Sequence, residues 1–346
     1  MKPVTSILIV KFAALGDVLR TSYILPGLQA KWPQARLWWL TADQAGDLLR
    51  YNPYVFRVCT PRCGFDALKA EQFDQLICLD EEPEILRRVA ELRARQTIGA
   101  RLVNGRPRYC SKSAPWFNMG LISRLGKAKA DELKRTNRLE HHRFLERMLG
   151  IRIAGPSFFN SGVLERRARM RFDQRCFNLG LASGAGGRWP AKQLPLAQTV
   201  ELVKRLLRAS VAGKPVRVYL LGGPAETERH RALRQTLSQA NLIDAGSAWG
   251  LLEFAALVKC CDYVISSDSL ALHLAIAQNV SNLSFYAPTS AAEIGTFGSG
   301  VKVVSSAEDY CCYRPDADSS TITAARILAA FARHLRRLRL ECAFNS

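Results

Sequence analysis

Short apolar runs alternate with amphipathic stretches along most of this chain. The first apolar runs predict strands at 6–11, 37–41, 55–59 and 75–79. Apolar residues recur at helical spacing between or after them, which predicts helices over 18–28, 45–51 and 84–95. Strands that alternate with helices favour a parallel sheet wrapped by helices, so the chain begins with a Rossmann-like unit.

A second series of the same kind begins at Phe177. It follows a basic, irregular stretch after Gly99, a charged helical stretch over 129–149 and a predicted linker over 151–175. Its predicted strands cover 177–182, 216–222, 242–245, 263–267 and 283–287, and its predicted helices cover 195–208, 226–238, 251–259 and 269–278. A last helix is predicted over 322–340. Two Rossmann-like units in tandem are expected to bind ligands at the carboxyl ends of their strands.

Length and composition agree with a globular protein of two domains. The chain has 346 residues, of which 48% are hydrophobic and 23% charged, so a largely disordered or collagen-like chain is excluded. Its longest apolar runs fall short of the roughly 18 residues that a spanning helix needs. The ten cysteines are too sparse for a disulfide scaffold and lack zinc-site spacing, so a reducing, cytoplasmic location is expected.

Positive charge is the strongest signal in the composition. The formal net charge is +19, and residues 84–150 contain 16 Lys and Arg against six Asp and Glu, a difference of +10. Nucleic acid, an anionic membrane face and a phosphorylated substrate all fit such a field, and so does a plain solvated surface.

The loop after the first predicted strand offers a candidate carboxylate. It lacks the G-x-G-x-x-G fingerprint, which argues against NAD. Gly16 permits a sharp turn, and Asp17 follows at the start of a helix. Asp17 is therefore either a helix cap or a general base that faces the ligand.

A glycine-rich loop follows the strand at 177–182. It runs from Ser183 to Lys192 and holds Gly184, Gly186 and Gly187 before Arg188. Glycines let backbone N–H groups approach an anion, and Arg188 or Lys192 would neutralise it. Alternatively, the loop is a simple turn and Trp189 packs in the core.

Two further strand ends carry polar residues. Ser267, Asp268 and Ser269 either cap the next helix or leave its N–H groups to a diphosphate, and His273 is either a packed or a catalytic histidine. After the strand at 216–222, Glu226 either starts a helix or accepts ribose hydroxyls.

These loops together resemble glycosyltransferase family 9, the lipopolysaccharide heptosyltransferases. Five stretches match in the order of the family, and they span nearly the whole chain: Ile7–Lys11 with Leu15–Val18, Gly184–Pro190, Leu221–Pro224 with Glu226, Ser267–Ser269 with His273, and Tyr286–Thr289.

The resemblance implies an α/β fold of GT-B architecture. It implies an N-terminal acceptor-binding domain over 1–160, a C-terminal nucleotide-sugar-binding domain over 161–320, and a final helix over 321–346 that packs back on the first domain. An interdomain cleft is expected between the two.

The resemblance also implies an inverting, metal-independent transferase that moves heptose from ADP-heptose to an anionic lipopolysaccharide-core acceptor. It acts without a cofactor at the cytoplasmic face of the inner membrane, in peripheral contact with anionic lipid, and no nucleic acid is expected. Asp17 would be the general base. Donor residues would be Ser183, Gly184, Gly186, Gly187, Arg188, Lys192, Glu226, Asp268, Ser269 and His273, and acceptor residues would be Lys11, Arg20, Arg106 and Lys112.

Two departures from the family pattern leave alternatives open. Gly187 stands where the family often has a basic residue, so the phosphate cation is either Arg188 or Lys192. Leu270 stands where many members have Gly, which leaves the donor sugar open. The alternatives are a transferase that uses another nucleotide sugar, a non-catalytic nucleotide- or glycan-binding protein, and a nucleic-acid-binding protein, although no nucleic-acid motif is present.

Overall fold

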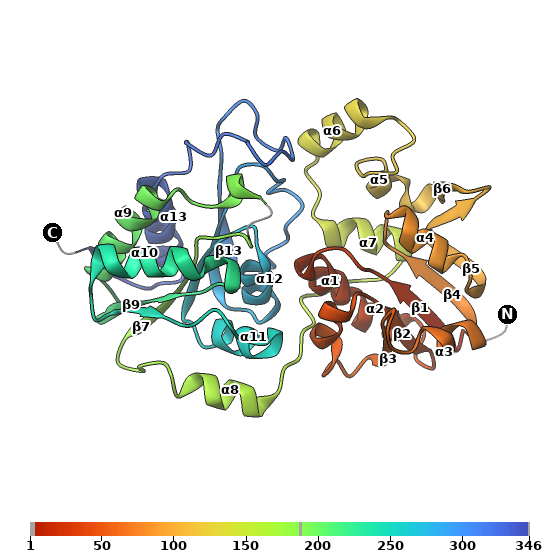
Figure 1. Cartoon of the computed structure of the whole chain (residues 1–346), viewed down its shortest axis with the longest axis horizontal. Coiled ribbons are helices and arrows are strands. Elements are labelled where there is room, and N and C mark those ends of the chain that lie inside the picture. Colours follow the sequence, from red (N-terminus) through yellow and green to blue (C-terminus); the bar gives the residue numbers. More distant parts are fainter. Residues whose placement is uncertain (1–3, 187–188, 345–346) are drawn as a thin grey trace. The chain divides into compact units, whose positions relative to one another are not determined.

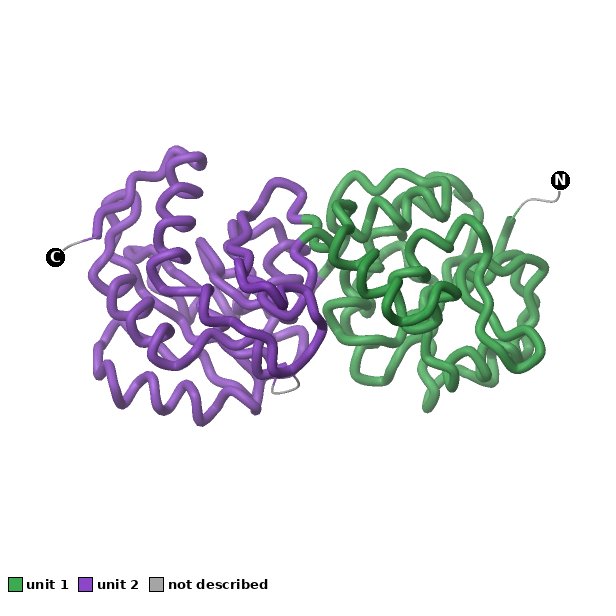
Figure 2. Tube along the Cα trace, turned by 90° about the horizontal axis from the view of Figure 1, so that it is seen from above, with its two compact units in different colours: residues 1–159, 292–295 green, residues 160–291, 296–346 purple. Residues whose placement is uncertain are grey.

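The computed structural model describes residues 4–186 and 189–344. The chain forms two compact units (Figure 2). Unit 1 comprises Met1–Phe159 together with Ala292–Gly295, and unit 2 comprises Asn160–Ala291 and Thr296–Ser346.

Unit 1 is built on a six-stranded sheet in the order β3-β2-β1-β4-β5-β6 (Figure 1). Five strands are parallel, and β6 runs antiparallel to β5. Every residue of the central strand β1 is buried, as expected for a strand covered on both faces. The strands are β1 (Ser6–Val10), β2 (Arg36–Leu40), β3 (Val55–Cys59), β4 (Gln72–Cys78), β5 (Arg93–Val103) and β6 (Arg106–Tyr109). The helices are α1 (Leu15–Thr21), α2 (Leu25–Lys31), α3 (Phe65–Ala70), α4 (Pro83–Val89), α5 (Ala114–Phe117), α6 (Lys127–Thr136) and α7 (His141–Leu149).

Unit 1 differs from the sequence prediction where the chain becomes basic. The helix predicted over 84–95 ends at Val89, and the stretch after Gly99 is ordered as a hairpin of β5 and β6. The helix predicted over 129–149 is two helices, because Asn137 leaves the helical region and its Oδ1 accepts from the backbone N–H of Leu139 at 2.8 Å.

Unit 2 is built on a larger sheet in the order β13-β12-β11-β7-β9-β8-β14, with β10 paired to β9. Its strands are β7 (Phe177–Ala182), β8 (Ala209–Val211), β9 (Lys214–Leu220), β10 (Leu242–Asp244), β11 (Tyr263–Ser267), β12 (Ser281–Tyr286), β13 (Gly300–Val304) and β14 (Cys342–Phe344). The helices are α8 (Gly162–Arg169), α9 (Leu196–Leu207), α10 (Thr227–Leu237), α11 (Leu251–Lys259), α12 (Leu270–Ala277) and α13 (Ala324–Arg337). Helix α8 lies inside the predicted linker and packs on α11, so that part of the linker prediction is wrong.

The last helix, α13, belongs to the core of unit 2. Ile327, Phe331 and Leu335 of α13 are fully buried in the core of unit 2, where the helix contacts α9, β12 and β13. His334 Nδ1 is hydrogen-bonded to Tyr263 Oη at 2.6 Å, and the chain then pairs β14 with β8. The apolar face of this helix is therefore covered by the sheet of its own unit.

The described residues contain no helix that is both long and apolar enough to span a membrane.

Candidate functional site

The site in unit 2 lies where four neighbouring parallel strands end. Strands β12, β11, β7 and β9 are adjacent and parallel, so the loops that follow them share one edge of the sheet. The loops are tied together there. Ser267 Oγ donates to the carbonyl of Gly184 at 2.6 Å, and the backbone N–H of Leu221 donates to the carbonyl of Leu181 at 2.9 Å.

Glu226 joins the glycine-rich loop to the loop after β9. Its two carboxylate oxygens accept from the backbone N–H groups of Gly186 and Gly223, each at 2.8 Å. A Cβ on Gly184 would lie 2.4 Å from Glu226 Cγ, and one on Gly222 would lie 2.6 Å from Glu226 Cβ. Glycine is thus required at both positions because the buried glutamate passes so close.

Ser183 is held by an arginine that the sequence analysis did not single out. Arg229 Nε donates to Ser183 Oγ at 3.0 Å, and its Nη2 donates to Thr199 Oγ1 at 2.6 Å and to the carbonyl of Leu194. Burial lowers the pKa of the Arg229 guanidinium. Ser183 therefore anchors its loop through a basic residue on α10, a contact that local sequence does not signal.

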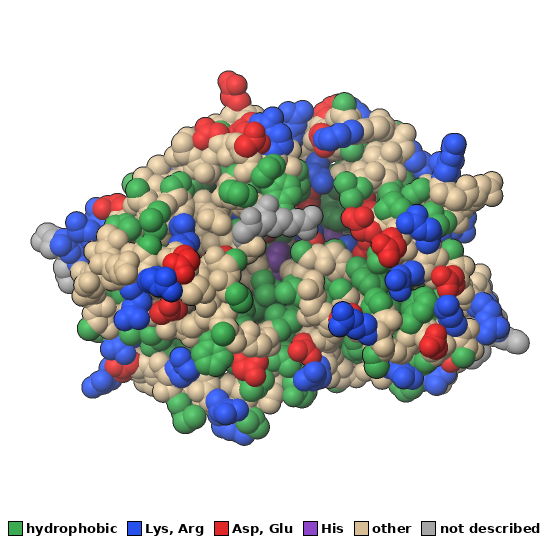
Figure 3. All heavy atoms as spheres, viewed as in Figure 1, with side chains coloured by type: hydrophobic (Ala, Val, Ile, Leu, Met, Phe, Trp, Pro, Cys, Tyr) green, Lys and Arg blue, Asp and Glu red, His purple; other side chains and the backbone are tan. Residues whose placement is uncertain are grey.

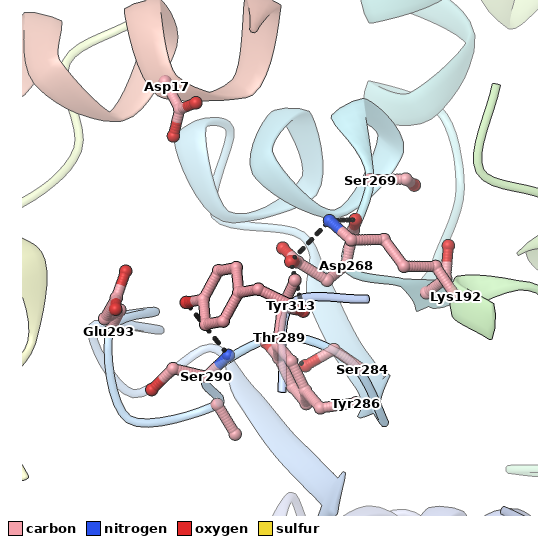
Figure 4. Close-up of polar contacts among 12 residues, drawn as sticks. Asp17, Lys192, Asp268, Ser269, Ser284, Tyr286, Thr289, Ser290, Glu293 and Tyr313 are labelled. Atoms are coloured by element: carbon pink, nitrogen blue, oxygen red, sulfur yellow. Dashed lines mark hydrogen bonds and ion pairs between the residues drawn. The ribbon is translucent and has the colours of Figure 1, made fainter. Parts of the chain in front are cut away.

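Asp268 is the centre of a buried polar cluster (Figure 4). Its Oδ2 accepts from Lys192 Nζ at 2.9 Å and from Thr289 Oγ1 at 2.7 Å, and its Oδ1 lies 3.6 Å from His273 Nε2. Burial by itself would raise the pKa of this carboxyl, but Lys192 and His273 outweigh it and hold the pKa well below its usual range. Asp268 is consequently an ionised carboxylate with several partners, and His273 is a packed histidine that faces it.

The start of α12 is left without a side-chain cap from its own loop. Ser269 is the N-cap residue and makes no side-chain cap hydrogen bond, because its Oγ lies 3.0 Å from Ser266 Oγ. Asp268 and Ser267 point to the partners described above. Of the two alternatives for these residues, capping by the Ser269 side chain is not observed, and binding of a diphosphate by the first backbone N–H groups of the helix stays a prediction.

A segment near Tyr313 braces the loop after β12. Tyr313 Oη accepts from the backbone N–H of Ser290 at 3.3 Å (Figure 4), and Tyr310 Oη accepts from that of Ala291 at 2.8 Å. The carbonyl of Pro315 accepts from the N–H of Ala191, beside Lys192, at 3.2 Å. This brace was not predicted, since its residues match no motif.

In unit 1, Asp17 lies in the first turn of α1 and is paired with Arg20. Arg20 Nη2 lies 2.6 Å from Asp17 Oδ1, and the Asp17 side chain is 33% exposed. The N-cap of α1 is Ala14, so Asp17 is not a plain cap. Arg20 Nη1 also lies 4.0 Å from Glu293 Oε2, in the short segment that unit 1 receives from late in the chain.

The remaining predicted residues fall in different surroundings. Lys11 Nζ donates to the carbonyl of Leu79 at 2.8 Å, which ties the loop after β1 to the end of β4. Arg106 and Lys112 are exposed on β6 and in the turn that follows it. Gly187 and Arg188 lie outside the described residues. Across the described parts of the chain, no group of three or more His, Cys, Asp or Glu is placed to hold a metal ion.

The sequence of the chain is similar to one glycosyltransferase family and to one protein named as a glycosyltransferase. The model of "Glycosyltransferase family 9 (heptosyltransferase)" matches residues 165–320. A protein of Haemophilus influenzae named "Putative glycosyltransferase" is 25% identical over 305 residues, which cover 81% of this chain and 82% of that protein.

Solved structures share the fold over nearly the full length. A family 9 glycosyl transferase from Veillonella parvula has a TM-score of 0.75 at 16% identity and covers 97% of this chain and 99% of its own. The ADP-heptose lps heptosyltransferase II of E. coli has a TM-score of 0.68 at 17% identity and covers 97% and 100%. The predicted GT-B architecture of two Rossmann-like units is confirmed. The resemblance to glycosyltransferase family 9 is confirmed as well, over residues 165–320, and the chain is a glycosyltransferase.

Proposed function

We propose that this glycosyltransferase moves a heptose from ADP-heptose to an anionic acceptor of the lipopolysaccharide inner-core type. The observation that carries the proposal is that the family match, residues 165–320, contains every loop at the carboxyl edge of the sheet of unit 2. The similar E. coli structure is named for ADP-heptose and lipopolysaccharide.

The donor diphosphate is proposed to bind at the start of α12 and along the glycine-rich loop. Uncapped backbone N–H groups and a lysine suit two adjacent phosphates. Lys192 Nζ uses two of its three N–H donors on the carbonyl and the carboxylate of Asp268, so one donor remains for a phosphate oxygen. Asp268 would thereby position the ammonium without occupying all its donors. Arg188 remains the second candidate for this contact.

The transfer step is proposed to depend on Asp17. Its carboxylate takes the proton of the acceptor hydroxyl as that oxygen attacks the anomeric carbon of the donor sugar. The bond between the anomeric carbon and the diphosphate breaks, ADP leaves with the electron pair, and the configuration inverts. The departing diphosphate gains negative charge, so N–H donors and a cation bind it more tightly in the transition state than before.

The acceptor is proposed to be anionic because basic residues of unit 1 lie near Asp17 in the sequence and on or just after β6. Lys11 and Arg20 flank Asp17 in the sequence, while Arg106 and Lys112 lie exposed on and after β6. A phosphorylated, lipid-linked acceptor would place the enzyme at the cytoplasmic face of a membrane.

Thermal unfolding with ADP, UDP, GDP and NAD in parallel tests the donor. Ligand at 100 times its Kd stabilises the protein by about 2.7 kcal/mol, and we expect this only with ADP. Turnover of ADP-heptose on truncated lipopolysaccharides, with and without a chelator, then tests the reaction.

The other outcomes are distinct. A thermal shift with UDP or GDP alone would mean that the donor carries that nucleotide instead of ADP. A thermal shift with ADP but no turnover on any acceptor would mean that the protein binds the nucleotide without transferring a sugar.

A further inference from the structure

Unit 1 has a buried carboxylate, Asp80, close to the loop that leads to Asp17. Asp and Glu side chains are spread among basic ones over the visible face of the molecule (Figure 3). Asp80 differs from these because it is only 2% exposed. It lies two residues beyond the end of β4, which pairs with β1, and so at the carboxyl edge of the sheet. A carboxylate withdrawn from water needs hydrogen-bond partners, and its partners show what it holds in place.

Asp80 accepts hydrogen bonds from backbone N–H groups of two loops. Its Oδ1 accepts from the N–H groups of Glu81 and Glu82, at 2.9 and 3.2 Å, in its own loop. Its Oδ2 accepts from the N–H of Phe12 at 2.8 Å, in the loop after β1. Both oxygens are thus occupied, and the side chain is too buried to meet a substrate. Its role is therefore to join the two loops.

The loop that Asp80 holds is the one that positions Asp17. Only the four residues 11–14 connect β1 to α1. Ala13 has a φ of +31°, in the left-handed region, which is unfavourable for a residue with a Cβ. Ala14 is the N-cap of α1, and its carbonyl accepts from the backbone N–H of Asp17 at 2.8 Å. The conformation of this turn thus sets where the backbone of Asp17 lies.

The bond to Asp80 offsets the unfavourable conformation of the turn. A charge-assisted hydrogen bond fixes the N–H of Phe12, the residue directly before Ala13. Lys11 Nζ makes a second connection between the same two loops, since it donates to the carbonyl of Leu79 at 2.8 Å. Without the carboxylate the turn would relax toward a more favourable conformation, and the start of α1 would move with it.

We propose that Asp80 is a positioning residue for the general base Asp17. Its bond to Phe12 keeps the turn, and with it the Asp17 carboxylate, where the acceptor hydroxyl is deprotonated. Misplacement of a reacting group by about 1 Å costs up to about 10²-fold in rate, so a displaced base lowers turnover. The inference rests on the proposed function, because it takes Asp17 as the base.

Asp80→Asn tests the contact with almost no change in side-chain size. An amide has one oxygen, so its NH2 group must face either the N–H of Phe12 or the N–H groups of the other loop, and one side of the junction is lost. We expect kcat to fall about 10- to 100-fold, whereas KM for ADP-heptose and the affinity for ADP should stay the same. Steady-state kinetics and calorimetry measure these quantities.

Asp74 offers a matched control at the opposite end of the same pair of strands. Its Oδ2 accepts from the backbone N–H groups of Thr5 and Ser6, at 2.8 and 3.2 Å, where β1 begins. Asp74→Asn therefore removes the same kind of contact at the edge of the sheet away from Asp17. Both variants should melt at a lower temperature, but kcat of Asp74→Asn should stay within about twofold of wild type, because ligands bind at the carboxyl edge.

A double substitution separates positioning of the base from general support of the fold. The base is already absent in Asp17→Asn, so adding Asp80→Asn should lower kcat further by about twofold or less. An independent structural effect would instead multiply the loss seen in Asp17→Asn. If Asp80→Asn does not fold, Asp80→Glu takes its place in each comparison, because it keeps the carboxylate and shifts it by one methylene.

The outcomes distinguish this inference from the proposed function. Multiplied losses in the double variant, or an equal loss of kcat in Asp74→Asn, would overturn the positioning role and leave Asp17 as the base. Unchanged kcat in Asp80→Asn beside a lowered kcat in Asp17→Asn would do the same. Unchanged kcat in Asp17→Asn would overturn the proposed base itself, and the role of Asp80 with it.

Discussion

Lys192 Nζ donates to both the carboxylate of Asp268, at 2.9 Å, and its backbone carbonyl, at 3.1 Å, across 76 residues of sequence. The side chains are 17% and 11% exposed, so the pair is largely withdrawn from water. It connects the glycine-rich loop after β7 to the loop after β11. The position of the lysine, and with it the proposed phosphate site, therefore depends on this carboxylate.

Removing the lysine should destabilise unit 2. Lys192→Met leaves an ionised carboxylate buried without its cation, and we expect a loss of about 2 to 4 kcal/mol in the free energy of unfolding. Lys192→Met/Asp268→Asn should recover much of it, because no charge is then left unpaired. Urea denaturation measures both, and Lys204→Met, on the exposed face of α9, is the control. Additive effects of the two substitutions would show that the pair is not coupled.

The same pair predicts how stability depends on pH. The pKa of Asp268 is lowered in the folded state from its unfolded value of 3.8. Its contribution is therefore complete above pH 3.8 and declines as the pH falls from there toward the folded pKa. The gap in unfolding free energy between the wild type and Asp268→Asn should be constant from pH 7 to pH 5 and shrink below about pH 4. A gap that narrows between pH 7 and pH 5 would assign the effect to another group.

Gly184→Ala should disturb the donor loops through Glu226. The new Cβ would lie 2.4 Å from Glu226 Cγ, so the glutamate must move and strain its bonds to Gly186 and Gly223. We expect a destabilisation of about 1 to 3 kcal/mol and weaker ADP binding, measured by thermal unfolding and calorimetry. Gly155→Ala is the control, because its Cβ would meet nothing within 4 Å. Unchanged ADP affinity in Gly184→Ala would mean that this loop does not take part in nucleotide binding.

Asp17→Asn tests the general base. Loss of a general base lowers turnover by about 10² to 10⁴, whereas ADP affinity should stay the same. Asp47→Asn is a matched control in unit 1, since Asp47 and Arg50 form an ion pair with the same spacing and the same 2.6 Å separation as Asp17 and Arg20. Equal turnover in the two variants would remove Asp17 from the mechanism.

Local patterns in the sequence predicted those parts of the fold that local physics governs. The apolar run before Lys11 and the helical spacing after Asp17 predicted β1 and α1, and the glycines near Ser183 predicted the loop after β7. Alternation of strands and helices then indicated that the loops of unit 2 would meet at one edge. The predicted roles of Asp17 and of the donor residues remain predictions.

Periodicity and glycine placement act over a few neighbouring residues, so they were enough to predict the two Rossmann-like units and the residue types at their strand ends. The partner of each side chain could be known only from the folded chain. There Glu226 accepts hydrogen bonds from two glycine N–H groups, Asp268 accepts from Lys192 and Thr289, and the final helix packs in the core of unit 2. Those choices depend on contacts between residues far apart in the chain, where burial makes an unpaired polar group or an uncovered apolar face too costly to leave.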